Sequence, residues 1–145
     1  MLYTTPVASL YNSRSDKKPK NPDAYGIEIE FELSQPILFE EDERYATFQL
    51  KGDGSLRNHG YECVSYPTPY TDLPRFYDEF NTLIRKQKTH CLESPRASVH
   101  VHVNVKDLLY FQLWNFMVLY YLLEEPIIGV AGPFRKNNLF AVSLN

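Results

Sequence analysis

Residues 25–33 read YGIEIEFEL, a strict alternation of apolar and acidic side chains. Side chains of a β-strand point alternately to two faces, so a strand here places Glu28, Glu30 and Glu32 in one row and the apolar residues in the other. The apolar row is typical of a strand that docks on a core. The acidic row spaces its carboxylates roughly 6.5–7 Å apart, and they repel one another unless a cation neutralises them. Two interpretations stay open: a metal-binding row, or an edge strand with a solvated acidic face.

The composition is that of one globular domain. The chain has 145 residues, 43% of them hydrophobic and 14% aromatic, and a formal net charge of −3. This charge gives no reason to expect a nucleic-acid partner. Two cysteines, Cys63 and Cys91, are too few for a disulfide framework. The N-terminus lacks the pattern of a signal peptide, and no apolar run is long enough for a membrane span. We therefore expect a cytoplasmic protein without a membrane partner.

The chain divides at a change of composition. Residues 1–23 are polar and interrupted by prolines, which predicts a flexible N-terminal arm. Residues 24–145 are expected to form a single α+β domain. Period-two alternation predicts further strands at residues 45–50, 60–66 and 98–105, and helical periodicity predicts helices at 72–88 and 107–124. Asp72 is the expected N-cap of the first helix, and Pro126 is expected to end the second.

A second strand also carries a row of possible ligands. In residues 98–105, four valines occupy one face, and Ser98, His100, His102 and Asn104 share the other. Asp53, in a glycine-rich turn, and Glu62, in a short strand, lie between the two strands in the sequence. Carboxylates with few imidazoles and no thiolates suit Mg²⁺ or Mn²⁺, whose usual role is to neutralise nucleotide phosphates. The alternative is a pair of hydrogen-bonded histidines with no metal.

Four short motifs resemble those of one protein family. They are GIEIEFE at 26–32, DGSL at 53–56, GYECVS at 60–65 and SVHVHVN at 98–104. In this order and approximate spacing they resemble the amidoligases, which are carboxylate–amine ligases of the glutamine synthetase and glutamate–cysteine ligase superfamily. The chain looks most like the compact forms encoded by bacteriophages and by bacterial peptide-modifying operons. The resemblance implies an α+β fold, in which helices pack on one face of a glutamine synthetase-like antiparallel sheet.

The resemblance also implies cofactors and site residues. ATP and Mg²⁺ (or Mn²⁺) are the expected cofactors. The implied metal ligands are Glu28, Glu30, Asp53, Glu62 and His100; the implied cofactor contacts are His100, His102, Ser55 and Asn104; the implied catalytic residues are Arg135 and Arg96. Glu32 lies beyond the core motif and is expected to be solvated. The two arginines would hold phosphate or the carboxylate of the substrate.

The implied reaction has two steps. ATP phosphorylates a carboxylate to give an acyl phosphate, and an amine then displaces the phosphate to form an amide. The expected partners are small-molecule or peptide carboxylates and amines, in the host cytoplasm if the chain is phage-encoded. Family members are normally longer and supply another metal-binding glutamate and a phosphate-contacting arginine downstream. We therefore expect an amide-forming ligase or the N-terminal part of one. The chain would be a fragment or one piece of a split gene, whose site a second chain completes, or a shortened protein that keeps the fold and has lost turnover.

Two other functions stay open at this point. The first is a non-catalytic phage interaction protein on a degenerate ligase scaffold, because the 11 tyrosines would suit a protein interface. The second is an unrelated metal-dependent hydrolase that uses the same carboxylate and histidine rows.

Overall fold

The computed structural model describes residues 24–38, 45–87 and 89–132. The chain forms two compact units: Asp23–Val103 is one, and Met1–Pro22 together with Asn104–Asn145 is the other. Each unit is described below by itself. The predicted N-terminal arm, residues 1–23, and the candidate residue Arg135 lie outside the described residues.

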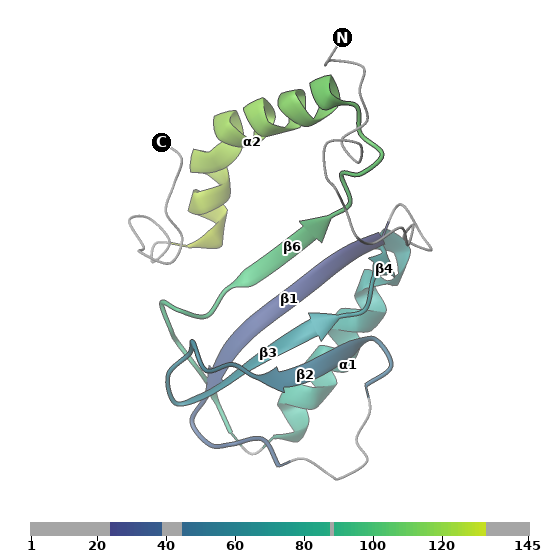
Figure 1. The fold of residues 1–145 in the computed structure, drawn as a ribbon. Coiled ribbons are helices and arrows are strands. Elements are labelled where there is room, and N and C mark those ends of the chain that lie inside the picture. Colours follow the sequence, from purple (N-terminus) through teal and green to yellow (C-terminus); the bar gives the residue numbers. More distant parts are fainter. Residues whose placement is uncertain (1–23, 39–44, 88, 133–145) are drawn as a thin grey trace. The chain divides into compact units, whose positions relative to one another are not determined.

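The Asp23–Val103 unit is built on an antiparallel sheet centred on β1 (Ala24–Leu33). Along one edge β1 pairs with β3 (His59–Ser65) and β4 (Thr68–Pro69), and β3 pairs in turn with β2 (Phe48–Gly52). Along its other edge β1 pairs with β5 (Cys91–Leu92) and β6 (Val99–Val103). Figure 1 shows β6 beside β1. The predicted α+β class is confirmed. The strands β4 and β5 were not predicted, because two residues are too few to show periodicity.

Helix α1 (Leu73–Lys86) packs on one face of this sheet, directly after the short 3-10 helix η3 (Tyr70–Asp72). Phe76 and Leu83 on the apolar stripe of α1 are fully buried. The core that they share with the sheet contains Ile27, Phe31, Leu33, Ile37, Phe48 and Cys63. Asp72 stands at the N-cap position as predicted, but its side chain makes no capping hydrogen bond.

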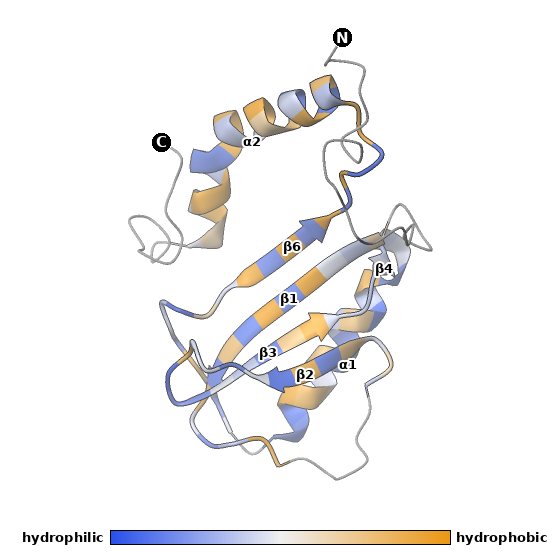
Figure 2. Ribbon diagram, viewed as in Figure 1, coloured by the Kyte–Doolittle hydropathy of each residue, from blue (hydrophilic) through white to orange (hydrophobic). Residues whose placement is uncertain are grey.

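Figure 2 shows the alternating hydropathy along β1 that produces this arrangement. Ile27, Phe31 and Leu33 are buried in the core, as the apolar row predicts. Burying them favours folding by roughly 1.5–3 kcal/mol for each fully buried large apolar side chain. The opposite face of β1 is thereby committed to the glutamates.

Glu32 is a correction to the expected solvated acidic row, because its exposed fraction is only 2%. Its carboxylate accepts hydrogen bonds from the Ser94 hydroxyl (2.6 Å), the Asn58 amide (2.8 Å) and the Arg57 backbone N–H (3.2 Å). Burial works to raise the pKa of Glu32, but these hydrogen bonds and the Arg57 charge outweigh it and hold the pKa below its ordinary value. Glu32 therefore joins β1 to two loops. Its position could not be read from β1 alone, because its partners come from distant segments.

Helix α2 (Tyr110–Ala131) belongs to the other unit. It begins later than predicted, where the Gln112 side chain accepts the Leu109 backbone N–H (2.8 Å). The prediction that Pro126 ends this helix is wrong, because the helix continues to Ala131 and is visibly bent (Figure 1). An internal proline removes one backbone hydrogen bond and kinks a helix. The helix can continue beyond the proline when the residues on both sides of it favour helical structure. No helix in the described parts of the chain is long and apolar enough to cross a membrane.

The hydrogen bonds of Glu32 predict an acid-sensitive fold. Because the folded-state pKa is lowered, the carboxylate stabilises the fold above its unfolded pKa of about 4.3, and this contribution is lost as the pH falls through the folded value. We expect Glu32→Gln to lower the unfolding free energy at pH 7 by about 1–3 kcal/mol, since an amide cannot accept all three donors. Urea unfolding at a series of pH values from 7 down to about 3 measures both effects. The exposed Glu93→Gln is the control and should change neither.

Candidate functional site

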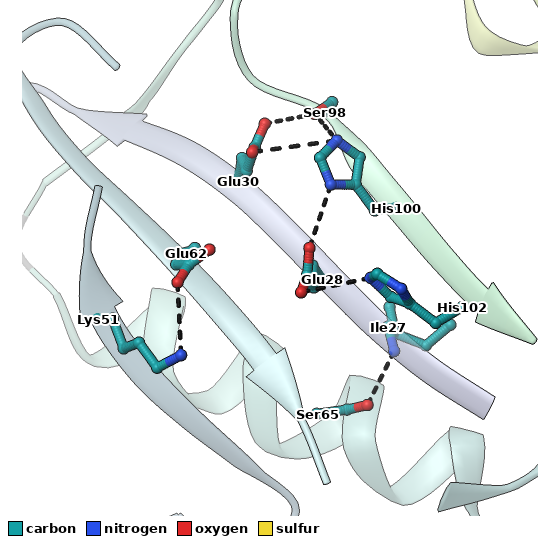
Figure 3. Close-up of polar contacts among 9 residues, drawn as sticks. All are labelled: Ile27, Glu28, Glu30, Lys51, Glu62, Ser65, Ser98, His100 and His102. Carbon is teal, nitrogen blue, oxygen red and sulfur yellow. Dashed lines mark hydrogen bonds and ion pairs between the residues drawn. The ribbon is translucent and has the colours of Figure 1, made fainter. Parts of the chain in front are cut away.

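The side chains of β1 that point away from α1 meet those of three neighbouring strands in two rows across the sheet. One row runs from Lys51 in β2 through Glu62 in β3 to Glu30 in β1. In the next row, Val64 of β3 lies opposite Glu28, and Glu28 lies opposite His100 of β6. Figure 3 shows Lys51, Glu62, Glu30, Glu28 and His100 on the same face of the sheet. The two predicted ligand rows therefore meet, because β1 and β6 are adjacent and in this register.

Glu28 lies between the two histidines of β6. Its Oε2 accepts a hydrogen bond from Nδ1 of His100 at 3.1 Å, and its Oε1 lies 3.3 Å from Nε2 of His102. Burial opposes ionisation of Glu28, but the hydrogen bonds and charges of the two histidines prevail, so its pKa lies below the ordinary value. The carboxylate therefore stays ionised and fixes the orientation of both rings.

Gly26 makes room for His102 in this arrangement. The two residues lie opposite each other in the register of β1 and β6. A Cβ atom at position 26 would lie 3.2 Å from Cβ of His102, which is tighter than most such contacts, and 3.5 Å from its Cδ2, which is an ordinary contact distance. The ring of His102 thus lies over the glycine backbone and reaches Glu28 from there.

Glu30 is linked to β6 through Ser98. The Ser98 hydroxyl donates a short hydrogen bond to Glu30 Oε2. Oγ of Ser98 also lies 2.8 Å from Nε2 of His100. The distance from Nε2 of His100 to Glu30 Oε1 is 4.0 Å. His100 is therefore connected to both neighbouring glutamates, directly to Glu28 and through the serine to Glu30 (Figure 3).

Glu30 also faces a second carboxylate. It lies directly opposite Glu62 in the register of β1 and β3. Like charges directly opposite on a sheet are destabilising, and the side chains are only 15% and 27% exposed, so water screens them incompletely. Nζ of Lys51 lies 3.6 Å from Glu62 Oε1 and offsets part of this negative charge. A face that gathers Glu28, Glu30 and Glu62 therefore suits a cationic ligand.

The remaining predicted site residues of this unit form a separate group at the β2–β3 turn. The Asp53 carboxylate accepts the backbone N–H of Ser55 at 2.8 Å, and the Ser55 carbonyl accepts Nη1 of Arg96 at 2.8 Å. Gly60 is required beside this turn, since a Cβ there would lie 2.4 Å from Cβ of Leu56. Asp53 therefore stabilises its own turn, and the structure shows no contact of its carboxylate with Glu28, Glu30 or Glu62.

Two predicted residues, Asn104 and Arg135, cannot be placed beside Glu28, Glu30 and Glu62 or beside the β2–β3 turn. Asn104, whose side chain accepts the Lys106 backbone N–H at 3.1 Å, belongs to the other unit. Arg135 lies outside the described residues. The sequence reasoning gave no role to Lys51, Ser98 and Gly26. Ser98 could have been found from its place in the His100 and His102 row, whereas Lys51 required the register of β2.

The described side chains do not form a ready metal site. No group of three or more His, Cys, Asp or Glu side chains converges to hold a metal ion in the residues that the structure describes. Glu28 is directed to the histidines and Glu62 to Lys51. The donor set has the chemistry for a hard divalent cation, and these contacts would have to open to admit one.

Comparison with protein-family models, with curated proteins and with solved structures found no match to this chain.

The contacts of Glu28 predict a measurable titration. We expect carbon-detected NMR to give a pKa for the Glu28 carboxyl below the ordinary glutamate range, and His100→Gln or His102→Gln to raise it, since each variant removes a charged partner. The exposed Glu93 serves as the internal reference and should titrate alike in all proteins. An ordinary value for Glu28 in the unmodified protein would contradict the described geometry.

Proposed function

We propose that this protein is an ATP- and Mg²⁺-dependent carboxylate–amine ligase, or part of one, that forms amide bonds through an acyl phosphate. The observation that supports this most is the position of Glu30 directly opposite Glu62, beside Glu28 and His100 on one face of the sheet. These are four of the five metal ligands that the family resemblance implies. The antiparallel sheet with α1 on its opposite face agrees with the implied architecture, while the 107–124 helix lies in the other unit and its predicted packing stays a prediction.

The electrostatics of this face favour a cationic partner. Three carboxylates lie in adjacent positions, and Lys51 pairs with one of them, Glu62. Mg²⁺ or Mn²⁺ prefers such oxygen ligands, and Glu28, Glu30 and Glu62 would hold it. When bound, the ion supplies positive charge that neutralises the ATP phosphates.

The side chains of this face can perform the remaining tasks of the reaction. Nζ of Lys51 and the imidazoles of His100 and His102 are nitrogen donors suited to phosphate oxygens. In the first step a carboxylate oxygen of the substrate attacks the γ-phosphorus and ADP leaves. In the second step a neutral amine attacks the acyl carbon, phosphate leaves, and the nitrogen gives up one proton to the departing phosphate. Arg96, held beside the turn by the Ser55 carbonyl, would orient the substrate carboxylate.

Thermal unfolding with nucleotide tests this function. We expect ATP with Mg²⁺ to raise the melting temperature by several degrees, since a ligand that binds only the folded state stabilises it. Glu30→Gln and Glu62→Gln should each abolish the shift, because they remove the facing carboxylates. Asp78→Asn, on an exposed position of α1, is the matched control and should retain it.

The other outcomes separate the competing functions. An equal shift in the Glu30 and Glu62 variants would contradict the proposed site. Absence of a shift with any nucleotide would favour an interaction protein. A shift with the divalent metal alone, unchanged by ATP, would favour a metal-dependent hydrolase.

One observation favours a second candidate, a serine hydrolase without a metal. Ser98 Oγ, His100 and Glu28 are connected in the order hydroxyl, Nε2, Nδ1, carboxylate, with distances of 2.8 Å and 3.1 Å. This is the connectivity by which a histidine activates a serine nucleophile and a carboxylate orients the histidine. The hydrogen bond from the Ser98 hydroxyl to Glu30 competes with it, which makes the candidate weaker than the ligase.

A serine-directed reagent tests this candidate. If His100 activates Ser98, a fluorophosphonate should attach to Ser98 Oγ with loss of fluoride, and Glu28→Gln should slow the labelling at least tenfold. Intact-mass spectrometry follows the reaction. The control variant Ser55→Ala replaces a serine within the β2–β3 turn, and its Ser98 should be labelled at the normal rate. Absence of labelling in the unmodified protein would exclude this candidate.

A further inference from the structure

Strand β6 forms one edge of the sheet, and its outward backbone groups belong to its valines. Among the described residues β6 pairs only with β1. The Glu30 N–H donates to the Ser98 carbonyl at 2.8 Å, so Ser98 faces β1. Backbone groups alternate in direction along an antiparallel strand, and those of His100 and His102 therefore also face β1. The N–H and C=O groups of Val99, Val101 and Val103 point away from β1, toward the open edge.

The valine side chains of this edge are also uncovered. Val99, Val101 and Val103 are 60%, 61% and 43% exposed. Natural sheets usually protect such an edge with lysine, proline or a bulge. Val99–Val103 contains no lysine or proline, and its register with β1 is continuous. The edge is therefore suited to pairing with another strand.

The sequence of β6 suits pairing with a second copy of itself. Any strand can pair antiparallel with its own copy about a two-fold axis, because a two-fold interface brings the same surface of both copies together. Residues 99–103 read VHVHV, which is the same in both directions about Val101, so the residues that face each other across such a pair are identical. Each valine then meets a valine on one face, and each histidine meets a histidine on the other.

We propose that β6 pairs antiparallel with β6 of a second copy of this chain, about a two-fold axis at Val101. The outward backbone groups determine the register: Val101 forms a hydrogen-bonded pair with its own equivalent, and Val99 forms one with Val103 of the second copy. The interface joins the two sheets into one. It concerns oligomeric state and does not depend on the ligase proposal.

The pairing has a consequence for the candidate site. His100 becomes the direct neighbour of His102 of the second copy, in a non-hydrogen-bonded pair whose side chains approach most closely. Each site beside Glu28 thus gains an imidazole from the other copy. Two five-residue strands make a small interface, and interfaces of this size class are weak and reversible. We therefore expect the dimer to dissociate on dilution.

Disulfide trapping tests the pairing and its register in the full chain. In a Cys91→Ser background, Val101→Cys should form a dimeric disulfide under mild oxidation, because hydrogen-bonded partners lie about 5.5 Å apart at Cα. Val99→Cys alone should cross-link at least tenfold more slowly, since its equivalents lie four residue steps apart. Mixing Val99→Cys with Val103→Cys protein should restore fast cross-linking. Cys63 is fully buried and should not react.

Paired charges provide a test that uses no oxidant. The Val99→Lys/Val103→Lys variant places lysine opposite lysine twice in the proposed register, whereas Val99→Lys/Val103→Glu places opposite charges together. Sedimentation equilibrium should show a dissociation constant at least tenfold lower for the second variant than for the first. Both variants alter the same exposed positions, so circular dichroism and thermal melting should show similar folding.

Each outcome decides the proposal. Fast trapping at position 101 and in the 99–103 mixture, with the expected charge preference, supports it. Equal trapping at positions 99 and 101 overturns it, because the contact then lacks this register. A monomer at all concentrations without trapping also overturns it, as does a dimer indifferent to the charge variants, which would use another surface or another strand partner.

Discussion

The structure of the Asp23–Val103 unit depends on the pairing of β1 along both of its edges. β3 and β4 bind one edge, and β5 and β6 bind the other. The alternation of apolar and acidic residues in β1 then divides the sheet into a face that packs on α1 and a face that carries charge. Register with this one strand positions Glu62, His100 and His102 on the charged face, and Lys51 follows through β3.

The two faces could be predicted from the sequence because period two is a local property. The alternation in residues 25–33 identifies Ile27, Phe31 and Leu33 as core, and the same period puts His100 and His102 on one face of β6. The α1 stripe was equally readable. In each case the pattern is contained in a few neighbouring residues, and burial of its apolar face in the core stabilises the resulting strand or helix.

What could not be predicted depends on long-range pairing. Nothing local places His100 opposite Glu28, which lies 72 positions away, or Glu62 opposite Glu30. The burial of Glu32 depends on donors from residues 57, 58 and 94, and its row alone suggested solvent. Pro126 shows the opposite error, in which a strong local signal for a helix end was overridden by the helix around it.

Translation gives the acidic row of β1 a further role. The residues of β3 leave the ribosome soon after β1, whereas those of β6 are made roughly 2–8 s later at ordinary rates of synthesis. During this interval residues 25–29 of β1 lack their partner strand β6. Glu28 and Glu30 then carry unpaired negative charge, since their histidine and serine partners do not yet exist. Their mutual repulsion disfavours pairing between the β1 strands of neighbouring nascent chains, so the same carboxylates would protect the protein during synthesis.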